Sequence, residues 1–323
     1  MSRAVKIWLI IAASLILAGG LIFVGVMTVN GWNFAALSTY EYETNEYEIT
    51  EEFTSISLKS YTSDIKLLPA EAERAKVVCR EETKLKHSVT VEDGMLSVEH
   101  VDSRKWYEHI GINFNFEEGS EITVYLPENE YDALSVSTDT GDVEISKSFN
   151  FNSVDISTST GEVENYASAS GKIRIKTSTG DIDVEDISCG TLELIVTTGD
   201  IDASNISCEG ECSVSVSTGS SELDDLECNS FVSSGSSGDI SLAGVIVSEK
   251  LSINRSTGDI SFNGCDASEI YITTDTGDVR GSLLSQKVFI ANTDTGKVSV
   301  PNSIEGGRCE ISTDTGDIIL TVK

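Results

Sequence analysis

The chain has 323 residues, with 22 Lys or Arg against 53 Asp or Glu, which gives a formal net charge of −31 at pH 7. Such a negative surface repels nucleic acid and anionic lipid headgroups, so neither is expected as a ligand of the folded part. The apolar fraction of 39% indicates a packed core and argues against disorder.

Residues 7–29, IWLIIAASLILAGGLIFVGVMTV, carry no charge and are long enough to cross the ~30 Å hydrocarbon core of a membrane. Arg3 and Lys6 precede this segment, and no acidic residue occurs before Glu41. Residues 1–30 are therefore predicted to be a cytoplasmic tail and transmembrane signal-anchor of a single-pass cell-membrane protein, with the remainder extracellular. A cleaved signal peptide is the alternative, although its apolar region is usually only ~7–15 residues long.

Residues 31–50 are predicted to be a linker, and residues 51–130 an N-terminal β cap region. The segment FTSISLKSYTSDIKLLP (53–69) reads as one degenerate repeat, and Asp93-Gly94 between alternating runs indicates a hairpin. A cap is expected because the first turn of a stacked repeat would otherwise expose an unpaired strand edge.

From residue 131 to 323 a glycine recurs with gaps of 19 or 20 residues. These repeat glycines are Gly141, Gly161, Gly180, Gly199, Gly219, Gly238, Gly258, Gly277, Gly296 and Gly316. Apolar residues alternate with polar ones at period two on both sides of each glycine, and the phase changes across it, which indicates strands joined by a corner. The pattern predicts an all-β fold: a right-handed parallel β-solenoid (β-helix) of about ten 19–20-residue coils, plus the N-terminal transmembrane helix.

In the recurring phrase Thr-Gly-Asp, the threonine is predicted to point inward and the acid outward. Stacked acids repel one another in water, and the simplest interpretation is a solvated face that keeps the rod soluble. A weak calcium site is the sharper alternative, because calcium takes several carboxylate oxygens. Its candidate ligands are Asp275, Asp278, Asp294, Asp314 and Asp317. Otherwise no metal and no cofactor is expected.

Cys189, Cys208 and Cys228 each follow a repeat glycine by nine residues, and Cys212 begins the next strand. Buried free thiols are the favoured interpretation; a disulfide between stacked neighbours and a four-cysteine zinc site are the alternatives. The histidines, His87, His100 and His109, do not have the spacing of a zinc-enzyme helix and are predicted to lie at the surface or in loops.

Arg255 stands three residues before a glycine, where other repeats place Thr or Val. A buried arginine is costly unless it is paired, so a local bulge that turns Arg255 outward is predicted.

The segment EITVYLPENEYDALSVSTDTGDVEI (121–145), followed by the serial TSTGDIDV, STGDISF and TDTGDVRG, resembles a bacterial family of membrane-anchored "putative adhesin" β-strand-repeat domains of unknown function. The resemblance covers about residues 50–323. It implies an envelope-exposed β-solenoid without established activity, and it offers no catalytic residues to transfer.

The function favoured by these features is a non-enzymatic cell-envelope surface module, an adhesin or scaffold, with an envelope protein or polysaccharide as partner. An accessory sensor or regulator of an envelope-stress pathway is the alternative, and a polysaccharide-active β-helix enzyme is the least favoured. No polar cap follows the last repeat, DTGDIILTVK, so its open C-terminal edge is predicted to mediate self-association.

Overall fold

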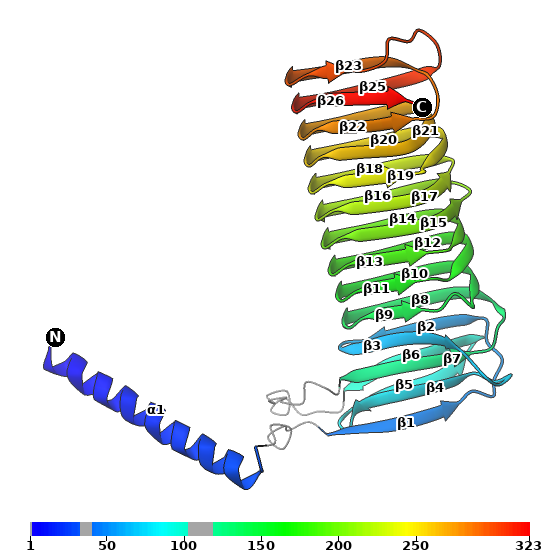
Figure 1. Cartoon of the computed structure of the whole chain (residues 1–323). Helices are drawn as coiled ribbons and strands as arrows, with labels where there is room; N and C mark the ends of the chain where they lie inside the picture. Colours follow the sequence, from blue (N-terminus) through cyan, green and yellow to red (C-terminus); the bar gives the residue numbers. More distant parts are fainter. Residues whose placement is uncertain (1, 33–40, 103–118) are drawn as a thin grey trace.

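The computed structural model describes residues 2–32, 41–102 and 119–323 of the chain. Helix α1 (Arg3–Val29) is the blue helix of Figure 1, and an 18-residue window within its apolar span Val5–Val29 has a mean hydropathy of 2.7. Within the described ranges it is the one helix that is long and apolar enough to span a membrane. A single helix of this kind fits a membrane anchor or a signal segment.

The rest of the described chain is a β-solenoid, which confirms the predicted fold class (Figure 1). Each coil contributes one strand before its repeat glycine and one after it, and equivalent strands of neighbouring coils pair in parallel register, as β10 pairs with both β8 and β12. The strands that lead to a glycine are β8 (Glu130–Thr140), β10 (Asn150–Thr160), β12 (Ser168–Thr179), β14 (Ser188–Thr198), β16 (Glu211–Thr218), β18 (Ser230–Ser237), β20 (Ile246–Thr257), β21 (Ile260–Thr276), β23 (Lys287–Thr295) and β25 (Gly307–Thr315).

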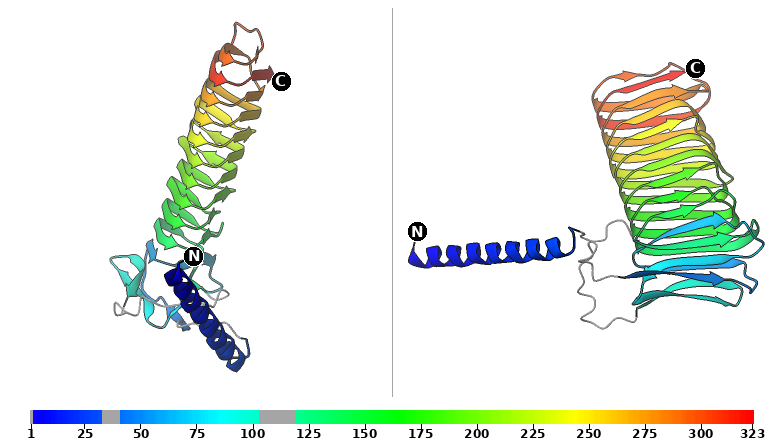
Figure 2. Two further views of the ribbon diagram at one scale, coloured as in Figure 1. Left: turned by 90° about the vertical axis from the view of Figure 1, so that its left-hand side faces the viewer. Right: turned by 60° about the horizontal axis from the view of Figure 1, so that its bottom comes forward.

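The strands that begin after the corner are shorter on average. They are β9 (Val143–Ile145), β11 (Val163–Asn165), β13 (Ile182–Glu185), β15 (Ile201–Cys208), β17 (Ser221–Cys228), β19 (Ile240–Ala243), β22 (Val279–Leu283), β24 (Val298–Ser299) and β26 (Ile318–Val322), while the start of β21 serves this purpose for its coil. Seen edge-on in the left view of Figure 2, the stacked coils form a narrow rod.

Alternation along the strands fills the interior of the rod with aliphatic side chains. Ile156 and Ile175, five residues before their glycines, are in register on adjacent strands and are both fully buried. Val163 and Ile182, two residues after, form the equivalent pair on the other side. Residues at the same position in successive repeats therefore stack on one another along the whole rod, and each coil buries the apolar side chains of the next.

The corner needs glycine for two reasons, which Gly161 illustrates. Its φ of +148° lies where side chains are strongly disfavoured. A Cβ there would also sit 2.1 Å from the carbonyl oxygen of Gly141 on the preceding coil. Close stacking of corner on corner thus requires the absence of a side chain, and this explains why the glycine recurs.

The prediction that the threonine next to the glycine points inward is wrong. Thr140 and Thr160 are exposed, whereas Thr138 and Thr158, two residues earlier, are buried. The chain begins its corner between these positions, so the last residue before glycine is rotated out of the core. The Thr138 hydroxyl donates to the carbonyl of Thr140 at 3.2 Å, which ties the strand end to its own corner.

The last coil in the sequence is not the last coil in space. Strand β21 pairs with β25, and β22 pairs with β26, while β23 and β24 pair with the outer sides of β25 and β26. The C-terminal coil is therefore inserted between its two predecessors, and β23 lies at the far end of the rod in Figure 1. The prediction of an open edge at the C-terminal coil is wrong, because residues 287–299 form that edge instead.

Before the first repeat glycine, seven further strands continue the stack: β1 (Tyr42–Glu48), β2 (Ser55–Ser60), β3 (Ser63–Pro69), β4 (Lys76–Glu82), β5 (Leu85–Glu92), β6 (Met95–Asp102) and β7 (Ser120–Leu126). Strands β2 and β3 form the degenerate coil, with Ser63 directly beneath Gly141. Strands β5 and β6 form the expected hairpin around Asp93-Gly94.

Beneath this coil, β6 and β7 add in parallel, and β4 and then β1 continue the stack in antiparallel pairing. Residues 42–48 were assigned to a linker from the sequence, and this assignment is wrong for them. Their polar alternation belongs to β1, an edge strand whose full length pairs with β4.

Candidate functional site

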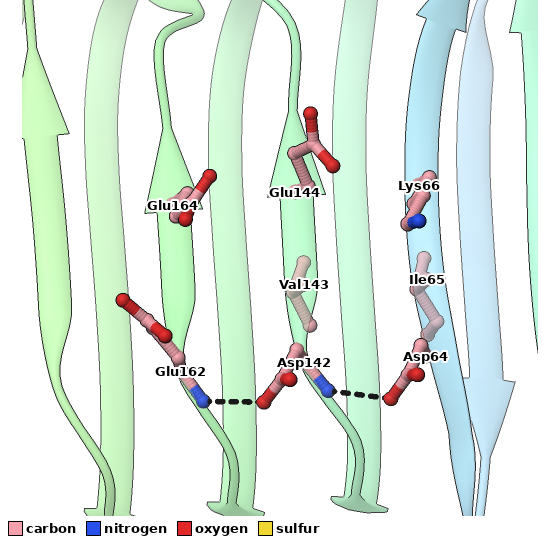
Figure 3. A pocket seen from close by; sticks show the side chains of 8 residues that line it. All are labelled: Asp64, Ile65, Lys66, Asp142, Val143, Glu144, Glu162 and Glu164. Carbon is pink, nitrogen blue, oxygen red and sulfur yellow. Dashed lines mark hydrogen bonds between the residues drawn. The ribbon is translucent and has the colours of Figure 1, made fainter. Parts of the chain in front are cut away.

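The repeated aspartate after the glycine holds neighbouring coils together. Oδ1 of Asp64 accepts a hydrogen bond from the backbone N–H of Asp142 at 3.0 Å, and Oδ1 of Asp142 accepts one from Glu162 at 2.9 Å (Figure 3). Further along the rod, Asp181 binds the N–H of Asp200 at 2.7 Å in the same way. The acids point outward as predicted, but the carboxylates of Asp64, Asp142 and Asp181 each also accept a hydrogen bond from a backbone N–H of the adjacent corner.

A second row of carboxylates lies two residues further along each coil. Its members are Glu144, Glu164, Asp183, Asp202 and Glu222, which follow one another in register on adjacent parallel strands. Together with Asp142, Glu162, Asp181 and Asp200 of the first row, they form what we call the acidic face. Two shallow grooves cross this face, one of ≈ 200 Å³ between Asp64 and Glu164 (Figure 3) and one of ≈ 280 Å³ between Asp200 and Ser241.

Partial burial and neighbouring carboxylates together disfavour ionisation on the acidic face. Partial burial and then the neighbouring Glu164 and Asp142 raise the pKa of Glu162. Partial burial also raises the pKa values of Asp183 and Asp202, with nearby carboxylates adding to the effect. A cationic group that docks here would relieve this repulsion, so the face favours positively charged ligands.

The five calcium candidates fall on two different rows. Asp278 and Asp317 belong to the corner ladder, where Asp278 Oδ1 accepts the N–H of Asp317 at 2.7 Å. Asp275, Asp314 and Asp294 form an exposed row before the glycines, in that spatial order because of the inserted coil.

Arg280 already supplies a positive charge to the corner row of these candidates. Its guanidinium hydrogen bonds to Asp278 and lies 3.7 Å from Asp317. This contact, followed by the backbone bond from Asp317, lowers the pKa of Asp278. Calcium binding at this end of the rod stays a prediction.

The histidines are not all superficial. His87 is 4% exposed, so its predicted surface position is wrong, because the β5–β6 hairpin turns this side chain toward the interior. His100 is half-buried and stacks edge-on against Tyr61 at 4.6 Å, and His109 lies outside the described residues. Sequence alternation in KHSVTVE is the one signal that could have marked His87 as inward.

His87 belongs to a buried polar cluster around Glu81. Nδ1 of His87 lies 2.8 Å from Oε2 of Glu81, which also accepts the backbone N–H of His87. The side-chain amide of Asn45 donates to Oε1 at 2.7 Å. Cys79 is two residues before Glu81 on the same inward face of β4, and burial, followed by the charge of Glu81, raises the pKa of its thiol to about 12.

The hydroxyls of Ser60 and Ser63 each lie 3.5 Å from Nε2 of His87. A serine, a histidine and a carboxylate in this order are the groups of a hydrolytic triad. However, Ser63 is 1% exposed and Ser60 is 8% exposed, so neither oxygen can meet an acyl substrate. The arrangement is a polar core network, and it gives no support to an enzymatic role.

All seven cysteines are buried free thiols, as favoured from the sequence. Cys189 and Cys208 are in register on adjacent strands, and a hydrogen bond from Cys189 lowers the pKa of the Cys208 thiol. In the described part of the chain, the four stacked cysteines do not bring their sulfur atoms together as a metal-binding group.

Arg255 is buried, with 1% of its surface exposed, so the predicted outward bulge is wrong. Gly235 on the preceding coil makes the space, because a Cβ there would lie 1.7 Å from Nη1 of Arg255. The guanidinium donates to the Val216 carbonyl and to the hydroxyls of Ser221 and Ser233, each at 3.3 Å. Burial lowers its pKa.

These features define a β-solenoid protein with an N-terminal helix that is long and apolar enough to span a membrane. Its coils are joined by stacked glycine corners and by a ladder of aspartate hydrogen bonds. The chain belongs to the Toastrack DUF4097 family, whose model matches residues 53–215 and 209–323. This confirms the resemblance seen in the repeats.

Several solved structures are similar in fold. One is described as a "putative lipid binding protein" from Parabacteroides distasonis, which is 17% identical, with a TM-score of 0.50 over 88% of this chain and 98% of that one. Another is a "putative adhesin" from Bacteroides fragilis, which is 14% identical, with a TM-score of 0.45 over 87% of this chain and 97% of that one. None of the curated proteins compared with the chain matches it.

Proposed function

We propose that this protein is a non-enzymatic cell-envelope surface module, held at the membrane by α1, which presents the acidic face of its solenoid to an envelope partner. The observation that carries the proposal is the pair of carboxylate rows on adjacent coils, where partial burial and then neighbouring carboxylates raise the pKa values of Glu162, Asp183 and Asp202. A surface that disfavours its own ionisation gains free energy when a cationic surface docks on it.

The proposed orientation places the N-terminus in the cytoplasm and the solenoid outside the cell. Arg3 and Lys6 lie at the N-terminal end of α1, before the uncharged residues 7–29, and basic residues favour the cytoplasmic side of a membrane. The proposed partner is an envelope protein with a basic surface, because the net charge of −31 repels anionic polymers.

Site-specific photo-crosslinking in intact cells tests the proposal. A crosslinking side chain at Asp202, on the acidic face, is expected to capture the partner, whereas one at Thr191, on an exposed site before the corner, is not. Equal capture from both positions would contradict a role for the acidic face. Capture of a membrane-embedded signalling protein would instead favour the sensor function.

A charge-matched pair of variants sharpens this test. Glu164→Gln, Asp183→Asn and Asp202→Asn together neutralise three of the five carboxylates of the second row, which does not carry the corner ladder. Glu209→Gln, Glu227→Gln and Glu249→Gln remove the same charge from exposed sites off the face. Only the first set is expected to lower the crosslinking yield. Similar losses from both sets would show a response to net charge alone.

A further inference from the structure

Three side chains that ligate transition metals converge inside the N-terminal strands. The sulfur of Cys79, a carboxylate oxygen of Glu81 and a ring nitrogen of His87 all lie within 4.8 Å of one another. No other set of three such residues meets this condition in the ranges that the structure describes. Cys79 and Glu81 have no exposed surface, and His87 has 4%.

Rigid backbone positions these groups. Cys79 and Glu81 alternate onto the same face of β4, which is paired on one side with β1 and on the other with β7. His87 follows on β5, whose first residue pairs with the last residue of β4. Ligands placed on paired strands keep their spacing without an ion, which lowers the cost of binding one.

We propose that Cys79, Glu81 and His87 bind a zinc ion inside the N-terminal strands. Thiolate, imidazole and carboxylate are the three ligand types that zinc takes in proteins, whereas calcium and magnesium prefer oxygen ligands alone. Three protein ligands leave the fourth tetrahedral position to a water molecule.

Charge balance supports an ion at this position. A carboxylate without exposed surface is costly unless its charge is compensated. A divalent ion bound to the Cys79 thiolate and the Glu81 carboxylate, with a neutral His87, gives a site of zero net charge. The competing arrangement is the hydrogen-bonded pair of Glu81 and His87 alone, with Cys79 packed as a thiol in the apolar core.

The residues around the three ligands are those expected to orient them. Asn45 holds the second oxygen of Glu81 at 2.7 Å. Nε2 of His87 faces the hydroxyls of Ser60 and Ser63 at 3.5 Å, and a histidine that binds metal through one nitrogen usually donates from the other.

Zinc binding here must release a proton. Zinc is bound by the thiolate, whereas an ordinary cysteine thiol is mainly protonated at pH 7, so the ion must displace that proton. The apparent zinc affinity is therefore expected to rise with pH, and cobalt binding should show the same dependence.

Metal titration of the full chain in detergent micelles tests the proposal. After removal of metal, ZnCl₂ is expected to bind at one ion per chain, and CoCl₂ is expected to give a thiolate-to-cobalt charge-transfer band. Cys79→Ser should abolish the band and weaken zinc binding more than about 100-fold, and Asn45→Ala should weaken it about tenfold. Cys309→Ser, a buried thiol on a distant coil, is the matched control and should change neither.

The absence of stoichiometric zinc and of a cobalt band in the wild-type chain would overturn the proposal. A band that survives Cys79→Ser but disappears in Cys208→Ser would overturn it too, by assigning the metal to the stacked cysteines. If circular dichroism shows that Cys79→Ser does not fold, His87→Gln and the wild-type titration decide. His87→Gln should keep a thiolate band of altered energy and lose zinc affinity, and unchanged affinity would contradict the site.

Discussion

Asp142 and Glu162 lie one coil apart, and the Asp142 carboxylate accepts a hydrogen bond from the backbone N–H of Glu162 at 2.9 Å. The same bond recurs from Asp200 to Ser220 and from Asp239 to Asp259. In the sequence these aspartates have the pattern of solvent-exposed surface residues, but in the structure their side chains hydrogen bond one coil to the next. The corner donors that it satisfies would otherwise depend on water.

Removing one of these hydrogen bonds between coils should lower stability modestly. Asp200→Ala deletes the acceptor for Ser220 and is expected to reduce the free energy of unfolding by about 1 kcal/mol. Asp200→Asn keeps an acceptor oxygen and should cost less. Urea denaturation of the β-solenoid measures both, with Asp139→Ala as the control for loss of an exposed carboxylate. Equal losses for Asp139→Ala and Asp200→Ala would show that the ladder bond contributes nothing.

Alanine substitutions at two glycines compare the free-energy cost of an unfavourable backbone conformation with the additional cost of pushing stacked corners apart. Gly180 and Gly94 both have positive φ, +129° and +77°. A Cβ at Gly180 would lie 2.2 Å from the carbonyl oxygen of Gly161, whereas one at Gly94 meets nothing within 4 Å. Gly94→Ala should cost about 1–2 kcal/mol, from conformation alone.

Gly180→Ala should cost more than about 4 kcal/mol, because the backbones of two corners must move apart. Melting temperatures of the two variants, measured in parallel, test the difference. Similar shifts would mean that the corners can separate without strain.

Replacing the buried Arg255 is not expected to destabilise the protein, even though its three hydrogen bonds are lost. Its partners are neutral oxygens, and its Nε is buried with no acceptor. Arg255→Met keeps much of the volume and removes the buried charge, so stability is expected to be unchanged or to rise by about 1–4 kcal/mol. Gly235→Ala, which drives a methyl into the guanidinium, should be strongly destabilising.

Equilibrium unfolding of both variants checks this expectation. A loss of more than about 2 kcal/mol in Arg255→Met would show that the guanidinium gains more from its three acceptors than its desolvation costs.

Calcium binding at the far end of the rod should depend on Arg280. Millimolar calcium is expected to raise the melting temperature more than sodium at equal ionic strength if Asp275, Asp278, Asp294, Asp314 and Asp317 bind it. Because Arg280 already neutralises part of Asp278 and Asp317, Arg280→Gln should enlarge the calcium-specific shift. Identical shifts from the two salts in both proteins would exclude a site here.

The sequence by itself determined the solenoid. A glycine every 19 or 20 residues, with period-two alternation on each side, admits few structures other than stacked strands with corners. The outward acids and buried cysteines followed from the same spacing. Strand patterning also identified the degenerate coil around Ser63 and the hairpin at Asp93-Gly94.

Only the tertiary structure decided which coil stacks on which. Every repeat presents the same ladder of apolar residues to either neighbour, so the pattern cannot state that β25 lies between β21 and β23. The surroundings of residues that depart from the repeat could not be predicted from the sequence either. Arg255 is buried because Gly235 makes room for it one coil away, and Glu81 meets Asn45 across the β1–β4 pairing. Alternation fixes which face a side chain takes, but contacts between distant segments fix what it meets there.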